Sequence, residues 1–183
     1  MSFILILGLG VASGLNPYVA VAITSIIVAR SELWAPAPEF VFVSSNAVLG
    51  GALFLLLIDV FADKFGWSGR WMDRVGWILR PAAGGLVGGV IFTGDAAAGL
   101  VFGSALGGFT ALLTHALRLR VRRRLQPRLR GFGRVVIGAY GNFGSGIVTM
   151  IAFMYPPLGL VIAIGVLLVA AAADYRWGVP DGG

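Results

Sequence analysis

The stretch Val11–Tyr18 reads VASGLNPY and interrupts the first long apolar run of the chain. Pro17 has no backbone N–H to donate, and Gly14 and Asn16 weaken a helix around it. A kink in one helix over residues 3–29 is the commoner outcome of such a pattern. The alternative is a fully broken helix, of the kind that transporters use to bind substrate at the middle of the membrane.

A second weak region lies near the other end of the chain, where residues 138–146 read GAYGNFGSG. Its polar residue Asn142 is the counterpart of Asn16 in the first region. Interrupted segments near both ends of the chain hint at an inverted repeat, although the residue-level similarity between them is slight. The substrate site predicted under the broken-helix alternative consists of Ser13, Asn16, Pro17 and Asn142.

The composition is that of an integral membrane protein. The chain of 183 residues is 58% hydrophobic and 12% charged, and long apolar runs recur from end to end. We therefore predict one transmembrane domain over residues 1–183, an all-α polytopic integral membrane helical bundle of about six transmembrane helices plus a short interfacial amphipathic helix. The predicted spans are residues 3–29, 40–62, 77–93, 96–117, 135–155 and 158–173.

The sequence contains no Cys and one His. This excludes disulfides, thiolate catalysis and sites that need several Cys or His ligands from one chain. We expect no metal, no cofactor and no enzymatic activity.

The basic residues set the expected orientation. With six spans, the segments between spans two and three and between spans four and five face one side, together with Arg176. Of the 14 Lys and Arg residues, only Arg30 then faces the other side. We expect a multi-pass protein of the inner (cytoplasmic) membrane with both termini cytoplasmic and a basic cytoplasmic loop at residues 118–134.

Lipid contacts are expected at the same side. Trp and Arg at helical spacing in residues 63–76 are typical of an interfacial helix, and Arg-rich loops bind anionic headgroups. Membrane lipids are thus the expected partners, and nucleic acid is not. The predicted headgroup contacts are Lys64, Trp67, Arg70, Trp71, Arg74, Arg80, Arg122, Arg123 and Arg124.

Small residues at four-residue spacing mark the third and fourth spans. Gly84 and Gly88 interleave with Gly85 and Gly89, and the fourth span repeats the spacing. Such steps let helices approach closely in lipid, so we predict a tightly packed helical hairpin.

Ionisable residues inside a membrane are functional candidates, because their burial is costly. Asp59 and Asp63 share a helix face, and the predicted topology puts both at a depth similar to that of His115. These three residues could form a polar gating cluster that relays protons or binds a cation. The alternative is a structural cluster where helices leave the membrane.

Several of these residues occur in an order that resembles the bacterial membrane family catalogued as domain of unknown function 4126. The resemblance covers about the first 125 residues, and the family usually has Glu at the position of Asp59 and a basic residue near Asn16. A polar Asn-Ser-Pro segment usual in the family is not evident. The resemblance implies a membrane fold and a polar cluster, with no established activity. The residues that carry it are Ala12, Ser13, Gly14, Leu15, Asp59, Asp63, Lys64, Asp73, Arg80, Pro81 and His115.

We expect the protein to be a small channel or transporter for an ion or small solute, as a homo-oligomer or within a larger membrane complex. The alternative is a non-catalytic accessory or scaffold subunit of such a complex. A third interpretation is an enzyme that acts on lipid headgroups.

Overall fold

The structure is a computed structural model of the chain. It describes residues 2–34, 36, 38–64, 69–92, 96–125 and 132–178. Side chains are described in these ranges except at 62–64, 69–72, 96–99, 124–125, 132–139, 173 and 176–178.

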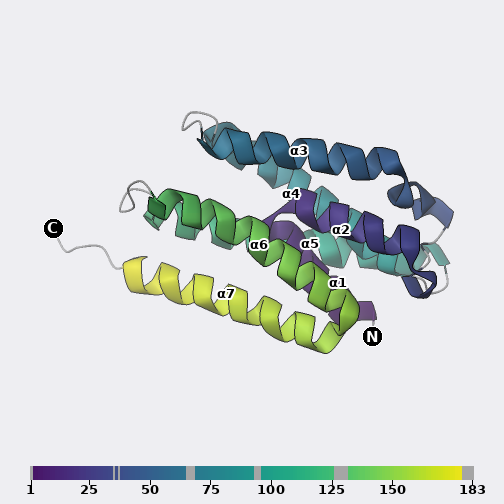
Figure 1. Ribbon diagram of the computed structural model, residues 1–183. Helices are drawn as coiled ribbons and strands as arrows, with labels where there is room; N and C mark the ends of the chain where they lie inside the picture. The colour runs from purple at the N-terminus through teal and green to yellow at the C-terminus, as the bar shows by residue number, and fades with distance from the viewer. Residues whose placement is uncertain are drawn as a thin grey trace.

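The described residues form helices and no strands, which confirms the all-α prediction. The elements in chain order are α1 (Ser2–Leu15), α2 (Pro17–Arg30), the 3-10 helices η1 (Glu32–Trp34) and η2 (Pro38–Ser44), α3 (Asn46–Lys64), α4 (Gly69–Ile91), α5 (Ala96–Leu125), α6 (Phe132–Met154) and α7 (Pro156–Gly178). From α3 to α7 the long helices run alternately up and down one bundle (Figure 1).

The first 30 residues do not form the single kinked helix that is the commoner outcome of the VASGLNPY pattern. Two helices of 14 residues each meet at Asn16, whose backbone is extended (φ −147°, ψ 111°). The chain enters the bundle along α1 and turns at Asn16, and α2 returns to the end from which α1 started (Figure 1). The broken-helix alternative therefore describes this region, with the added feature that the chain reverses direction.

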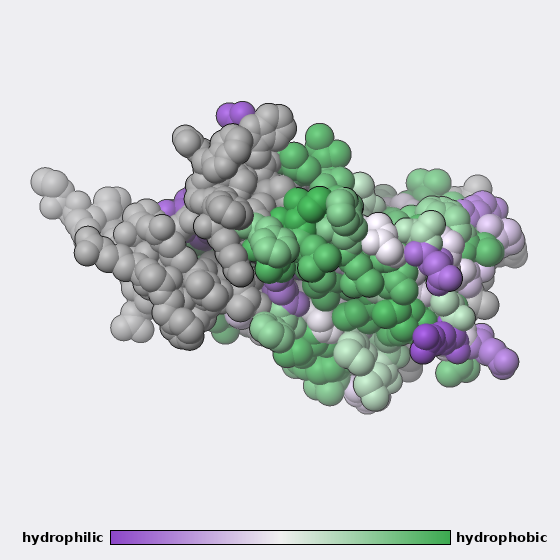
Figure 2. Space-filling view, turned by 45° about the horizontal axis from the view of Figure 1, so that its top comes forward, coloured by the Kyte–Doolittle hydropathy of each residue, from purple (hydrophilic) through white to green (hydrophobic). Residues whose placement is uncertain are grey.

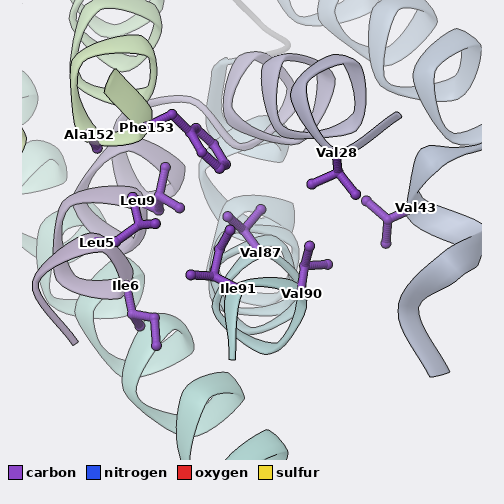
Figure 3. Packing of buried hydrophobic residues seen from close by; sticks show 10 residues of the cluster. All are labelled: Leu5, Ile6, Leu9, Val28, Val43, Val87, Val90, Ile91, Ala152 and Phe153. Atoms are coloured by element: carbon purple, nitrogen blue, oxygen red, sulfur yellow. The ribbon is translucent and has the colours of Figure 1, made fainter. Parts of the chain in front are cut away.

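The main hydrophobic core proves this reversal. Leu5 and Leu9 of α1 share one buried cluster with Val28 of α2, and the cluster also contains Ile91 and Phe153 (Figure 3). Ile91 ends α4 and Phe153 lies next to the end of α6, so both ends of the hairpin lie beside those helix ends. We call α1 and α2 together the α1–α2 hairpin.

The predicted close approach of the third and fourth spans is present between α4 and α5. A Cβ atom at Gly84 would lie 2.6 Å from Ala111 Cβ, and one at Gly103 would lie 2.8 Å from the Gly88 carbonyl oxygen. No side chain larger than hydrogen fits at these positions without moving a helix backbone.

Two boundaries differ from those expected. Helix α4 runs without interruption from Gly69 through Pro81 to Ile91, so the structure shows no separate interfacial helix over the described part of residues 63–76. Helix α5 continues to Leu125 and takes up the first half of the predicted basic loop at 118–134. Polar pairing with α4, described below, accompanies this extension.

The two ends of the chain also differ from expectation. The start of α1 and the end of α7 lie at opposite ends of the bundle (Figure 1). Six crossings would have placed them together. The difference arises because the chain reverses direction at Asn16.

Apolar side chains cover much of the outer surface. Figure 2 shows a broad hydrophobic face, bordered on one side by hydrophilic residues. Among the described residues, one helix, Leu100–Arg123, is long and apolar enough to cross a membrane alone. The pair Pro38–Ser44 and Asn46–Phe61, bent by 55°, qualifies when it is taken as one span. These segments point to membrane association.

Candidate functional site

Asn16 occupies the tip of the α1–α2 hairpin and is fully buried. Its side-chain Oδ1 accepts hydrogen bonds from the backbone N–H groups of Tyr18 (3.0 Å) and Val19 (3.1 Å). This is the arrangement of a helix N-cap, and Pro17 fits the first helical position because it has no N–H to satisfy. The sequence Asn-Pro therefore starts α2 immediately after α1 has ended.

The amide nitrogen of Asn16 links the hairpin tip to two further helices, α3 and α6. Its Nδ2 donates to Asp59 Oδ2 of α3 at 3.1 Å and to Asn142 Oδ1 of α6 at 2.7 Å. The backbone carbonyl of Asn16 accepts a hydrogen bond from Ser145 Oγ at 2.9 Å. The side chains of both weak regions identified in the sequence thus meet at one point.

Arg80 closes the other side of the hairpin tip. Only 7% of this residue is exposed, and its Nη1 donates to the carbonyl oxygens of Gly14 and Leu15, the latter at 3.0 Å. The carbonyl end of a helix carries partial negative charge, so a guanidinium there is stabilised. Arg80 and Asp59 also lie close enough to attract each other. We call Asn16, Asp59, Arg80, Asn142 and Ser145 the central cluster.

His115 lies beside the central cluster on α5 and is 1% exposed. Its ring meets the indole of Trp77 edge-on, with centroids 5.3 Å apart. No hydrogen bond joins His115 to Asp59. The structure therefore places Arg80 next to His115, and the predicted pairing of His115 with Asp59 is absent.

Polar residues continue from His115 towards the end of the bundle where α4 begins. Arg122 Nη1 of α5 pairs with Asp73 Oδ1 of α4 at 3.3 Å, and both side chains are largely buried. Arg118 lies between His115 and Arg122 along α5 and packs against Gly141 of α6. A Cβ atom at Gly141 would lie 2.9 Å from Arg118 Nη2. His115, Arg118 and Arg122 are three, then four residues apart, so they lie along one face of α5.

The remaining predicted site residues have varied positions. Ser13 is fully buried, and its Oγ has no partner among the described residues. Arg80 was predicted to contact headgroups but is buried, because it binds the end of α1. Arg74 and Arg123 are exposed. Five predicted headgroup contacts and one acid of the predicted gating cluster lie outside the described side chains: Lys64, Trp67, Arg70, Trp71, Arg124 and Asp63.

Comparison with known families extends the resemblance seen in the sequence. A family model matches residues 3–175, which is nearly the whole chain. The chain belongs to the family described as domain of unknown function (DUF4126). The match includes the last third of the chain, which the residue-level resemblance did not reach. No curated protein and no solved structure gave a significant match.

In this DUF4126 chain, sequence reasoning missed two contributors to the central cluster. Ser145 is one of several small polar residues in an apolar helix, and nothing in its spacing distinguishes it. Arg80 did carry a signal, because an Arg within an apolar segment has to find a partner or a route to water. Within the described residues, no group of three or more His, Asp or Glu side chains could hold a metal ion.

Proposed function

We propose that the chain is a multi-pass membrane protein that moves a small polar or charged solute through its central cluster. The membrane part of this proposal is supported by large apolar side chains that face outwards. They include Phe54 (64% exposed), Val101 (65%), Phe143 (72%) and Val161 (64%), on four different helices. Exposed apolar side chains of this size on several helices are typical of contact with lipid.

The proposed topology has five crossings, α3 to α7, and one re-entrant hairpin. Each arm of the α1–α2 hairpin is about 21 Å long at the usual helical rise. A hydrocarbon core of roughly 30 Å is longer than either arm, so each arm reaches only part of the way across. Arg74, Arg122 and Arg123 then lie at the cytoplasmic end and Arg30 at the other. The N-terminus accordingly lies on the side opposite to that predicted from six spans.

One observation carries the functional proposal. The tip of the hairpin is buried in the middle of the bundle and brings two helix ends, one Asp, one Arg and two Asn side chains together. Broken helices whose ends meet near the middle of the membrane form the substrate and ion sites of many transporters. A charge in a membrane interior is costly, so a purely structural hairpin would not need Asp59 and Arg80 there.

Flux through reconstituted liposomes tests the proposal. The purified protein should make vesicles permeable to a small ion or polar solute, measured with a panel of tracers. Asp59→Asn removes the negative charge of the central cluster but keeps a hydrogen-bond acceptor for Asn16. We expect this variant to lose at least about tenfold in flux, as removal of a charged group from a buried polar site costs a few kcal/mol.

Glu39→Gln is the matched control, because Glu39 is an exposed acid of η2 and lies far along the chain from the cluster. It should conduct like the parent protein. Flux that is the same in Asp59→Asn and the parent would contradict the role of the cluster. Absence of any flux, together with a stoichiometric partner after gentle purification, would favour an accessory subunit.

A further inference from the structure

The members of the central cluster are in direct contact with one another. Asn16 Nδ2 lies 3.1 Å from Asp59 Oδ2 and 2.7 Å from Asn142 Oδ1. The Asn16 carbonyl oxygen lies 2.9 Å from Ser145 Oγ. These are the lengths of ordinary hydrogen bonds, so no atom of a solute fits between the bonded groups. A solute with heavy atoms would have to break these bonds and take their place.

The helices beside the cluster are also tightly packed. A Cβ atom at Gly14, two residues before Asn16, would lie 2.7 Å from the carbonyl oxygen of Ala111 on α5. A Cβ atom at Gly84, one turn after Arg80 on α4, would lie 2.6 Å from Ala111 Cβ. The helices α1, α4 and α5 thus meet with little more than backbone between them. A proton differs from other solutes in this setting, because it is transferred between groups that are already within hydrogen-bond distance.

Asp59 is the member of the cluster that can hold a proton. Amide and hydroxyl side chains do not titrate in the ordinary pH range, and an Arg guanidinium stays protonated. Carboxylates inside membranes serve as proton relays in pumps and transporters. Asp59 is partly exposed and lies five residues before the end of α3 at Lys64, which is about 8 Å along the helix. A proton from the water at that end therefore has a short route to this carboxylate.

Two described side chains of other helices carry groups whose charge acts with that of Asp59. Arg80 of α4 attracts it, and Tyr18 of α2 lies close enough for its hydroxyl group to be affected. Asn16 adds an N–H donor at 3.1 Å, which favours the ionised carboxylate. The two charged residues that follow on α3 lie outside the described side chains: Asp63 and Lys64.

Protonation of Asp59 changes how α3 is held. The neutral acid still accepts a hydrogen bond from Asn16, but it no longer attracts the charge of Arg80. Arg80 keeps its bonds to the carbonyl oxygens at the end of α1, so the hairpin tip stays with α4. Proton uptake thus weakens the contact of α3 with the central cluster and leaves the contact of α4 in place.

Buried hydroxyl groups continue from the cluster towards the opposite end of the bundle. Ser145 and Thr149 lie one turn apart on α6, and Thr24 and Ser25 lie on α2. These parts of α6 and α2 run from the hairpin tip to the end of α2 at Arg30. A hydroxyl group both donates and accepts hydrogen bonds, which is the property that a relay of protons requires.

We infer that the solute is the proton and that the carboxylate of Asp59 is the group that binds it. This inference rests on the proposed function and specifies its substrate. A hydronium ion gives its proton to a carboxylate oxygen and becomes water. The O–H bond formed on Asp59 breaks again when the proton leaves for water on the other side, so no other reactant is consumed.

Proton flux is measured in liposomes that contain the whole chain and a trapped pH-sensitive dye. A potassium gradient with valinomycin sets the membrane potential that drives protons inwards. The parent protein should acidify the lumen, and Glu39→Gln should do so at the same rate. Asp59→Asn should be slower by at least about tenfold, because an amide cannot take up the proton. Asp59→Glu keeps a carboxylate and should retain most of the flux.

Two results of this assay would overturn the inference. One is equal proton flux in the parent protein and Asp59→Asn. The other is an equal loss of proton flux in Asp59→Asn and Asp59→Glu, because the carboxylate would then not be the group that matters.

A second measurement uses the parent protein alone and does not depend on how a variant folds. Dicyclohexylcarbodiimide dissolves in lipid and adds covalently to carboxyl groups in their protonated form. We expect it to modify Asp59 faster at lower pH and to stop proton flux in step with the modification, which mass spectrometry of peptides locates. Proton flux that survives complete modification of Asp59, or that stops while Asp59 is unmodified, would contradict the inference.

The proton inference and the transport function fail in different ways. Flux of another tracer that needs Asp59, in vesicles without proton flux, would exclude the proton as the solute and keep the transport function. Absence of flux for protons and for every tracer would contradict the transport function itself.

Discussion

At the scale of single residues, Asn16 makes four side-chain hydrogen bonds to residues of three helices. It caps α2 through Oδ1 and links α3 and α6 through Nδ2, and its carbonyl accepts from Ser145. No other amino acid can accept two backbone N–H bonds and donate two side-chain bonds from the same short side chain in this place. Asp would repel Asp59, and Ser has too few donors.

We predict that Asn16→Ala destabilises the protein strongly. Loss of an N-cap costs about 0.5–2 kcal/mol, and the partners left unpaired inside the bundle add about 1–3 kcal/mol. The measurement is the midpoint of thermal unfolding in detergent, which should be clearly lower for Asn16→Ala than for the parent protein.

Ser44→Ala is the control for this prediction. Ser44 Oγ also bonds to the backbone, at 2.6 Å from the Val41 oxygen, but in an exposed position. Its loss should shift the midpoint little. Equal shifts for Asn16→Ala and Ser44→Ala would show that Asn16 has no special role at the hairpin tip.

Part of the central cluster is predictable from sequence at this scale. Asn16 and Asn142 stand out because polar residues beside helix breakers in apolar segments are rare. The partners are less predictable, because Asp59 faces Asn16 in the structure and His115 faces Arg80. Helix spacing tells which residues share a face, but it does not tell which face of another helix they meet.

At the scale of elements, the pairing of α4 with α5 determines how closely the bundle packs. Gly84, Gly88, Gly103 and Gly107 place backbone against backbone along this contact. The four-residue spacing of these glycines was sufficient to predict the close contact between α4 and α5. Glycines four residues apart lie on one face of each helix and leave that face without side chains.

We predict that Gly107→Val separates α4 from α5. A Cβ atom at residue 107 would collide with the Gly84 carbonyl oxygen and lie 3.2 Å from the Gly88 Cα. Overpacking of this kind costs about 1–3 kcal/mol, and more where backbone has to move. Unfolding by sodium dodecyl sulfate should occur at a lower mole fraction of the detergent than in the parent.

Gly51→Val is the control for the steric effect. It changes helix propensity as Gly107→Val does, but a Cβ atom at residue 51 meets nothing within 4 Å. It should leave the unfolding curve nearly unchanged. If both valine variants unfolded at the same point, close packing of α4 against α5 would not be what stabilises the bundle.

The α1–α2 hairpin marks the limit of prediction from sequence at this scale. Asn16 and Pro17 encode the break locally, and both a kink and a break agree with that pattern. The direction of the chain after the break depends on contacts far away in sequence, such as Trp34 with Phe153, whose ring centroids are 5.7 Å apart. Apolar periodicity contains no information about such contacts.

At the scale of the whole molecule, the proposed topology reverses the expected side of the N-terminus, because the hairpin turns the chain back. The described Arg74, Arg122 and Arg123 lie at one end of the bundle, so the orientation proposed for α3 to α7 is the one expected from the sequence. The first 30 residues, in contrast, enter and leave at the same end. This geometry places a polar tip inside the bundle with its two helix ends facing Asp59 and Arg80, and the proposed function depends on it.

Site-directed labelling tests the hairpin most directly, because the chain contains no Cys to interfere. Single variants Ser2→Cys, Leu33→Cys and Tyr175→Cys are treated with a membrane-impermeant maleimide in sealed vesicles of known orientation. Leu33 and Tyr175 are 89% and 83% exposed, so both should react readily from their own sides. We predict that Ser2→Cys and Leu33→Cys are labelled from one side and Tyr175→Cys from the other. Labelling of Ser2→Cys from the side of Tyr175→Cys, opposite to Leu33→Cys, would mean that the first 30 residues cross the membrane and would contradict the account.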